Sequence, residues 1–184
     1  MPYKTHKQYR LPGYDYARGG DYFITICTKN RIRYFGKIFK TKDDAFIDLS
    51  AIGLFVAESI ESIPVTYKHV SLGETIVMPD HIHLVIILET SVTGNAPKQS
   101  KIQHALSPNK GLKPLTPGSV SSIANHLKGK VKKWCNLNGY SYFEWQARFH
   151  DHIIRDAESF DRINNYIANN VWNWRGDEKN DFRP

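Results

Sequence analysis

Apolar residues along the chain occur in two patterns, short continuous runs and series with helical spacing. Residues 22–28 and 77–87 are short runs rich in β-branched and aromatic side chains, which is typical of buried strands. Residues 65–77 predict a further strand that is interrupted near Gly73, and residues 148–154 predict a fourth. The sequence therefore predicts four strands.

Three series of apolar residues recur every three to four positions and predict helices with one apolar face. The first helix is expected to begin after Thr41, because Thr41 and Asp44 have capping-box spacing, and to end at Pro64. Ser119 and Asp156 are positioned to cap the second and third helices. The apolar positions are, in chain order, Phe46, Leu49, Ile52, Val56, Ile60 and Ile63; Val120, Ile123, Leu127, Val131 and Trp134; and Phe160, Ile163, Ile167, Val171 and Trp174.

The predicted order is strand, helix, strand, strand, helix, strand, followed by an extra helix. We therefore expect an α+β fold, a ferredoxin-like β-α-β-β-α-β sandwich with an antiparallel sheet and an extra carboxyl-terminal helix over residues 156–174. The length of 184 residues favours a single domain over residues 1–184. Residues 1–19 predict a surface arm, and residues 89–118, with four prolines, predict a flexible loop inside the domain.

The composition is that of a soluble globular protein, with 41% hydrophobic and 23% charged residues. No stretch approaches the roughly 20 consecutive apolar residues that span a bilayer. Residues 1–7 lead into no apolar segment, so we expect no signal peptide. Cys27 and Cys135 lie far apart without metal-ligand spacing, which favours free thiols and a cytoplasmic protein.

The formal net charge of +7 shifts the expected partners toward polyanions. Basic residues are concentrated in residues 29–42, in residues 98–113, and at Lys128, Lys130, Lys132 and Lys133. Charge alone excludes little, because many basic proteins bind no nucleic acid.

Two histidines in the predicted strand over residues 77–87 are candidates for metal binding. Side chains alternate along a strand, so His81 and His83 project from one face while Ile82 projects from the other. Two neutral imidazoles on one face can share a divalent metal ion, each oriented by a further partner. The alternative is a pair of ordinary histidines at a strand end.

Tyr166 and Asn170 are four residues apart on the predicted last helix and so lie on one helix face. Asn170 can offer its amide oxygen to the same metal, and the Tyr166 hydroxyl would then lie near whatever the metal polarises. A phenol has an ordinary pKa of about 10, so it becomes a nucleophile only with help from a cation or a base. The alternatives are a packing tyrosine and an asparagine that caps the helix.

Five segments, taken together, carry a family resemblance. They are GYDY at 13–16, YFITICT at 22–28, VMPDHIH at 77–83, WQARF at 145–149 with HIIR at 152–155, and YIANN at 166–170. In this order they resemble the single-tyrosine HUH transposases, and within them the REP-associated tyrosine transposase branch. The similarity covers nearly the whole chain except residues 89–118. His-x-His alone is a weak signal, but Met-Pro-x-His-x-His with a downstream Tyr-Ile-x-x-Asn is a specific one.

The resemblance implies a DNA-processing enzyme. Members bind single-stranded or hairpin DNA and use a divalent metal, Mg or Mn, held by the two histidines. The tyrosine attacks a phosphodiester and leaves a 5′-phosphotyrosine link and a free 3′-hydroxyl, a step that can reverse on another DNA end. Carried over, His81, His83 and Asn170 are expected metal ligands and Tyr166 the expected nucleophile for DNA nicking, strand transfer and transposition.

The chain departs from the family pattern at two positions. Asp80 stands where the family usually has asparagine and adds negative charge near the site, and Val171 stands where proline commonly follows the asparagine. His150 and His152 form a second His-x-His, and we expect structural roles for them. Related transposases act as homodimers with shared sites or as monomers, so the resemblance leaves open whether the tyrosine acts in cis or in trans.

DNA binding is expected to involve two further groups of residues. The four lysines Lys128, Lys130, Lys132 and Lys133 are expected to contact phosphates, with a solvated helix face as the alternative. The arm residues expected to grip a hairpin base or stack on unpaired bases are Arg10, Tyr14, Tyr16 and Arg18.

Three other functions compete with the transposase hypothesis. The chain can be a domesticated hairpin-DNA-binding protein without cleavage activity, in which case the metal-dependent nicking is absent. It can be a metal-dependent phosphoesterase that uses activated water, in which case Tyr166→Phe retains activity. An RNA-binding ferredoxin-like domain ranks last, because its sheet needs exposed aromatic residues for stacking.

Overall fold

A computed structural model describes residues 19–89 and 115–174 of the chain. Its main sheet has four antiparallel strands in the spatial order β4-β5-β1-β6. The strands are β1 (Gly20–Cys27), β4 (Val70–Met78), β5 (His81–Leu88) and β6 (His150–Ile154). Together with the helices that connect them along the chain, these strands form a ferredoxin-like α+β sandwich. The predicted fold is therefore confirmed, apart from an inserted hairpin.

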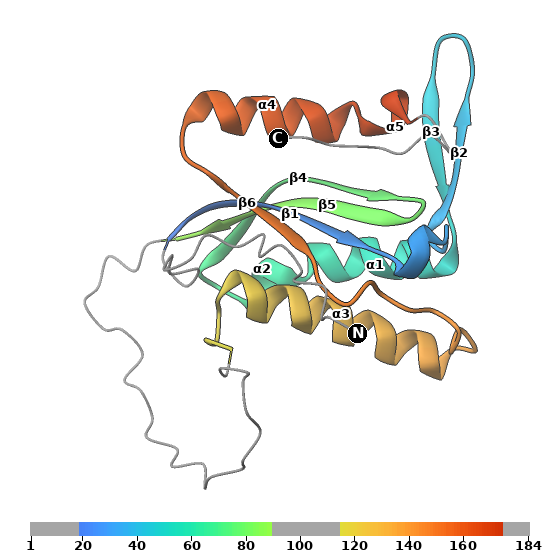
Figure 1. The fold of residues 1–184 in the computed structure, drawn as a ribbon, viewed down its shortest axis with the longest axis horizontal. Helices are drawn as coiled ribbons and strands as arrows, with labels where there is room; N and C mark the ends of the chain where they lie inside the picture. The colour runs from blue at the N-terminus through green and yellow to red at the C-terminus, as the bar shows by residue number, and fades with distance from the viewer. Residues whose placement is uncertain (1–18, 90–114, 175–184) are drawn as a thin grey trace, which may run out of the picture.

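Helices cover both faces of this sheet, so the molecule has three layers (Figure 1). One face carries α1 (Ala51–Glu61), the short α2 (Ile63–Thr66) and α3 (Val120–Leu137). The other face carries α4 (Ala157–Ala168) and the short α5 (Asn170–Asn173).

Strand alternation divides the apolar side chains into two cores. On β1, the alternate residues Tyr22, Ile24 and Ile26 belong to the larger core with α1 and α3. Phe23 points the opposite way and packs in a smaller core with residues of β5, β6 and α4. The smaller core consists of Phe23, Val85, Ile154, Ile163 and Ile167. It holds α4 against the sheet face that also carries the two histidines.

An inserted hairpin replaces the first part of the helix predicted after Thr41. The strands β2 (Gly36–Lys40) and β3 (Ala45–Leu49) form a separate two-stranded ribbon that protrudes from the body (Figure 1). The helix prediction is wrong here, because Thr41 Oγ1 accepts the Asp44 N–H, 3.0 Å away, within the hairpin turn. The helix begins at Ala51 instead, where the Ser50 hydroxyl accepts the Gly53 N–H.

Other element boundaries differ by a few residues from those predicted. Pro64 lies in the first turn of α2 rather than ending a helix. The second core strand, β4, begins at Val70 rather than at residue 65, and its register with β5 shifts between Leu72 and Thr75, next to Gly73 as predicted. Strand β6 begins at His150, two residues later than predicted.

The predicted continuous helix over residues 156–174 is divided into two. Asp156 caps α4 by accepting the Ser159 N–H, as predicted, but α4 ends at Ala168. Asn169 then separates α4 from α5. The tyrosine and the asparagine of the candidate site therefore lie on different helices.

Some predictions concern residues outside the described parts of the chain. Residues 1–18 of the predicted arm and residues 90–114 of the predicted loop are among them, and the single-domain assignment stays a prediction. Cys27 and Cys135 are both buried and unpaired with any described cysteine. Among the described helices, none combines the length and the apolar character needed to cross a bilayer.

Candidate active site

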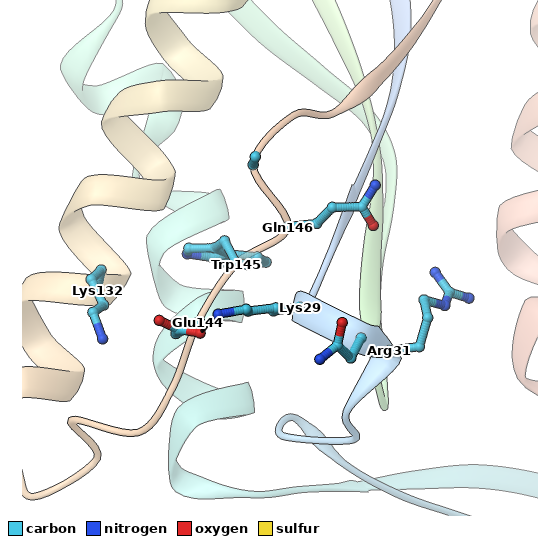
Figure 2. A pocket seen from close by; sticks show the side chains of 8 residues that line it. Lys29, Arg31, Lys132, Glu144, Trp145 and Gln146 are labelled. Carbon is cyan, nitrogen blue, oxygen red and sulfur yellow. Dashed lines mark hydrogen bonds and ion pairs between the residues drawn. The ribbon is translucent and has the colours of Figure 1, made fainter. Parts of the chain in front are cut away.

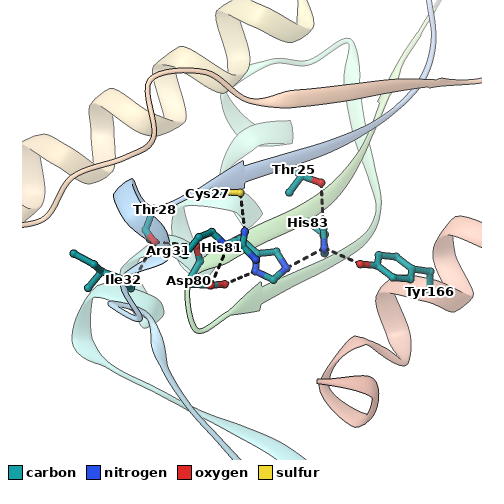
Figure 3. A network of polar contacts seen from close by, with 9 residues as sticks. All are labelled: Thr25, Cys27, Thr28, Arg31, Ile32, Asp80, His81, His83 and Tyr166. Atoms are coloured by element: carbon teal, nitrogen blue, oxygen red, sulfur yellow. Dashed lines mark hydrogen bonds and ion pairs between the residues drawn. The ribbon is translucent and has the colours of Figure 1, made fainter. Parts of the chain in front are cut away.

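The two histidines lie at the start of β5, directly after the tight turn from β4. Strand alternation directs both rings toward the sheet face that α4 covers, as predicted. Their Nε2 atoms are 3.0 Å apart, and only 2% of His81 and 3% of His83 is exposed. The pair is therefore a buried site with two ring nitrogens converging on one point (Figure 3).

Each imidazole has a further partner at its Nδ1 atom. His81 Nδ1 lies 2.6 Å from Asp80 Oδ1, and His83 Nδ1 lies 2.8 Å from the hydroxyl of Thr25, its cross-strand partner on β1. A carboxylate only accepts hydrogen bonds, so His81 donates its Nδ1 proton to Asp80. The Thr25 hydroxyl holds the His83 ring at Nδ1, so the Nε2 atoms of both rings point toward each other. Two imidazole nitrogens that converge in this way can bind one divalent cation.

Burial keeps both imidazoles neutral. Desolvation is the largest influence on each ring and lowers the pKa of His81 and, more strongly, the pKa of His83. The hydrogen bond and the charge of Asp80 partly oppose this effect at His81. Neutral imidazoles are the form that binds metal ions.

Tyr166 approaches the histidine pair from α4. Its hydroxyl lies 3.4 Å from His83 Nε2, and its ring contacts the rings of His83 and Phe23 edge-on. Burial raises the pKa of this phenol, while a hydrogen bond with the Asn170 side chain and the charge of Arg31 lower it. The resting phenol is therefore protonated at neutral pH.

Asn170 completes the group as the first residue of α5. Its side chain is buried, with 4% of the residue exposed, and its Oδ1 atom has no hydrogen-bond partner among the described residues. An amide oxygen is a ligand type suited to Mg and Mn. The donor set of two imidazole nitrogens and one unpartnered amide oxygen therefore fits a divalent metal. The described residues contain no cluster of three or more histidine, cysteine, aspartate and glutamate side chains that could serve instead.

Trp174, the last described residue, lies beside the histidine pair. Its ring stacks near that of His81, with the ring centroids 6.0 Å apart. The hairpin holds this segment, because the Lys40 ammonium donates to the carbonyl oxygens of Trp172, 2.6 Å away, and of Trp174. The guanidinium of Arg33 lies 5.9 Å from the centre of the Trp174 ring.

Arg31 is a residue of the site that the sequence analysis did not single out. It lies in the short helix η1 (Lys29–Arg31), which follows β1, and its side chain reaches the buried carboxylate of Asp80. The sequence shows only a basic loop after a strand, so no local signal separates Arg31 from its basic neighbours.

A groove of about 680 Å³ lies beside η1. Its lining residues are Lys29, Asn30, Arg31, Lys132, Glu144, Trp145, Gln146 and Ala147. In Figure 2, Lys29 points toward Glu144, with which it forms an ion pair, while the Arg31 side chain points away. The short helix thus contributes Lys29 to a surface groove and Arg31 to the contact with Asp80.

The four predicted DNA-binding lysines lie on α3, and three of them form hydrogen bonds with residues outside this helix. Lys128 Nζ donates to the carbonyl of Gln146, Lys132 Nζ to those of Ser141 and Phe143, and Lys130 Nζ to the Ser62 hydroxyl. Lys133 is exposed. Helix α3 covers the sheet face opposite the histidine pair.

The remaining predicted residues are not brought to the site. Arg10, Tyr14, Tyr16 and Arg18 lie outside the described residues. His150 is exposed and His152 half-buried on β6, where His152 is the cross-strand partner of Phe23. Their DNA-binding or structural roles stay predictions.

The fold is similar to that of a REP-associated tyrosine transposase that was solved bound to a REP hairpin. The two structures align with a TM-score of 0.54 and 18% sequence identity over 88% of this chain and 72% of the transposase chain. The expected resemblance to this class is thus confirmed at the level of the fold. A transposase-like protein from Deinococcus radiodurans aligns with a TM-score of 0.43 and 13% identity over 87% of this chain and 95% of that chain.

The sequence itself matches an uncharacterised protein of Haemophilus influenzae. The two sequences are 33% identical over 169 residues, which are 92% of this chain and 89% of that protein. The chain therefore belongs to the same family as the H. influenzae protein. No protein-family model matches the sequence.

Proposed function

We propose that the protein is a tyrosine HUH DNA transposase or endonuclease. It nicks single-stranded or hairpin DNA in a metal-dependent reaction and transfers the strand through a 5′-phosphotyrosine. The observation that carries the proposal is the position of the Tyr166 hydroxyl, 3.4 Å from Nε2 of a buried, metal-compatible histidine pair. A fold alone leaves function open, so the proposal depends on this site.

In this proposal, His81, His83 and Asn170 hold the metal ion. A divalent ion such as Mg or Mn, when bound, polarises the scissile phosphate and offsets its charge. The rings of His83 and Phe23 contact Tyr166 edge-on and restrict its phenol to one orientation toward the histidine pair. A nucleophile fixed in this way loses little entropy in the reaction.

The reaction conserves the number of phosphate ester bonds. The Tyr166 oxygen forms a bond to phosphorus while the bond from phosphorus to the 3′ oxygen breaks, and the phenol proton is balanced by the proton that the 3′-hydroxyl gains. No nucleotide cofactor is needed, because the tyrosine ester replaces the phosphodiester. The same step in reverse joins the 5′ end to a different 3′-hydroxyl, which is strand transfer.

Hairpin DNA is the proposed partner. The fold neighbour was solved with a REP hairpin, and the formal net charge of +7 suits a polyanion. An RNA-binding module of the kind that stacks bases on an open sheet is disfavoured, because helices cover both faces of the four-stranded sheet.

The test uses a pool of labelled hairpin oligonucleotides with randomised single-stranded flanks, so that no target sequence has to be known. The protein is incubated with the pool and Mn, and covalent protein–DNA adducts are separated under denaturing conditions. We expect an adduct with the wild type and none with Tyr166→Phe. Tyr142→Phe is the matched control, since Tyr142 is 60% exposed, its ring contacts those of Tyr34 and Tyr140, and the loss of its hydroxyl should leave the adduct unchanged.

Two results would contradict the proposal. Cleavage that persists in Tyr166→Phe without any adduct would identify water as the nucleophile and the protein as a phosphoesterase. Binding of the pool without cleavage or adduct would identify a domesticated hairpin-binding protein.

A further inference from the structure

Arg31 occupies a backbone conformation that residues other than glycine rarely adopt. Asn30 and Arg31 both lie in the left-handed region, with φ values of 55° and 57°. Such residues are energetically unfavourable and persist only where the surroundings enforce them. Here the Thr28 hydroxyl lies 2.7 Å from the carbonyl oxygen of Ile32 and 3.0 Å from that of Asp80. The turn is therefore fixed to the loop that carries Asp80.

This conformation directs the Arg31 side chain to the end of the sheet. Its Nε atom lies 3.0 Å from Asp80 Oδ2, and its Nη1 atom lies 2.9 Å from the sulfur of Cys27. The Asp80 side chain is only 7% exposed, and a buried carboxylate is strongly destabilising unless charged groups pair with it. Arg31 supplies that charge, so this pair differs from a surface ion pair.

The two oxygens of Asp80 have different partners. Oδ2 contacts Arg31, and Oδ1 accepts a hydrogen bond from His81 Nδ1, which lies 2.6 Å away. A carboxylate held at both oxygens has a fixed plane, and a fixed carboxylate fixes the ring that donates to it. The contacts therefore run without a gap from Arg31 through Asp80 and His81 to His83 (Figure 3).

We propose that Arg31 is a positioning residue for the histidine pair. Acting through Asp80, it holds the His81 imidazole with its proton on Nδ1 and its Nε2 lone pair turned toward His83. The inference rests on the proposed function for the use that is made of the pair, but the orientation of the ring can be measured without DNA.

The fork of donors on arginine is part of the arrangement. Arg31 uses Nε for Asp80 and Nη1 for Cys27, two donors held in one rigid plane. Lysine keeps the positive charge but has a single flexible ammonium, so it satisfies the charge of Asp80 without fixing the carboxylate plane. Comparing Arg31→Lys with Arg31→Gln therefore separates charge from positioning.

The experiment measures the tautomer of His81 and the affinity for Mn. In metal-free protein, long-range ¹H–¹⁵N correlation spectra of the imidazole rings report which nitrogen of His81 carries the proton, and calorimetry reports Mn binding. We expect Arg31→Gln to mix the His81 tautomers and to weaken Mn binding about 10- to 100-fold. We expect Arg31→Lys to be intermediate, and Lys37→Gln, which removes one positive charge from an exposed strand position, to behave as the wild type.

A double variant tests whether Arg31 acts through the carboxylate. Asp80→Ala alone should weaken Mn binding, and adding Arg31→Gln to it should weaken binding no further, because the side chain that links Arg31 to His81 is already lost. Additive losses would overturn the proposal, as would an unchanged His81 tautomer in Arg31→Gln. If Arg31→Gln fails to fold, judged by circular dichroism, the same tautomer measurement on Arg31→Lys and Asp80→Ala decides the question.

The outcomes for this inference and for the proposed function are distinct. A wild type that binds Mn but forms no DNA adduct overturns the proposed function and leaves the role of Arg31 to be decided by the His81 tautomer. A wild type that forms the adduct while Arg31→Gln retains the His81 tautomer overturns only the role of Arg31.

Discussion

The hydroxyl of Tyr166 and Nε2 of His83 lie 3.4 Å apart within one chain. Tyr166 belongs to α4 and His83 to β5, and these elements pack against each other through the small core around Phe23 and Val85. The candidate nucleophile and a candidate metal ligand therefore meet inside a single subunit. This arrangement favours a tyrosine that acts in cis.

Mixing two inactive variants tests this arrangement. We expect a mixture of Tyr166→Phe and His83→Ala to form no covalent DNA adduct, because neither chain contains a complete site. A mixture of wild type and His83→Ala is the control and should retain the adduct of the wild-type component. Adduct formed by the two inactive variants together would show that the tyrosine acts in trans.

Asn170 is expected to contribute to metal affinity. Its Oδ1 atom is buried without a described partner, so Asn170→Ala removes a ligand and should weaken Mn binding by at least about tenfold. Asn170→Asp should bind Mn at least as tightly as the wild type, because a carboxylate oxygen replaces the amide oxygen. Calorimetric titration after removal of metal with a chelator measures both effects.

The exposed Asn173 at the end of α5 offers a matched control for this prediction. Asn173→Ala should leave Mn affinity unchanged. Equal losses in Asn170→Ala and Asn173→Ala would indicate a general disturbance of α5 rather than a lost ligand.

Two helical glycines should respond in opposite directions to substitution by alanine. A Cβ atom at Gly53 of α1 would overlap the carbonyl oxygen of Phe35, so Gly53→Ala should lower the free energy of unfolding by about 1–3 kcal/mol or more. A Cβ atom at Gly129 of α3 meets nothing within 4 Å, so Gly129→Ala should raise it by about 0.5–1 kcal/mol. Urea unfolding of the two variants measures both changes. A stabilised Gly53→Ala would contradict the packing of β2 and its preceding loop against α1.

The stability of the metal-free protein should fall below pH 6.5. Burial lowers the pKa of His83 well below the ordinary value of about 6.5, so only the unfolded chain takes up this proton as the pH falls. The contribution of neutral His83 to the free energy of unfolding is complete above the pKa of this histidine in the unfolded chain. It is lost as the pH decreases toward the pKa of His83 in the folded protein. Urea unfolding with a chelator at pH 8 and at pH 5.5 should show a smaller loss for His83→Gln than for the wild type. An equal loss in both proteins would contradict a buried neutral His83.

The strands and caps that depend on local patterns could be predicted from the sequence. The run over residues 22–28 became β1, the run over residues 77–87 became the end of β4, a turn and most of β5, and Ser119 and Asp156 cap their helices through the N–H groups of Ser122 and Ser159. In each case the contacts that decide the structure lie within a few residues of the signal.

The hairpin could not be predicted, because its local signals are the same as those of a helix. A threonine hydroxyl that accepts an N–H three residues later, as Thr41 does from Asp44, occurs both at a helix start and in this turn. Phe46 continues the helical spacing of the following apolar residues, yet it is 51% exposed and stacks on Phe39 across the ribbon. An exposed aromatic pair of this kind cannot be distinguished from core residues in the sequence.

The candidate site was accessible to sequence reasoning only in part. Strand alternation was enough to place His81 and His83 together, because it is a local property of the backbone. The position of Asn170 depends on a helix break at Asn169, and the reach of Arg31 depends on two left-handed residues that are not glycine. No sequence rule predicts either feature, since neighbouring elements impose both.

The hairpin is a self-contained insertion between β1 and α1. Gly36 and Leu49 are cross-strand partners, so the two ends of the ribbon lie about 5 Å apart, and a short link between them would leave the four-stranded sheet intact. The Lys40 ammonium is nevertheless bound to the carbonyls of Trp172 and Trp174, beside His81. The ribbon can therefore be lengthened, shortened or exchanged as a module during evolution. Each such change would alter how Trp172 and Trp174 are held beside the histidine pair, although neither histidine itself would change.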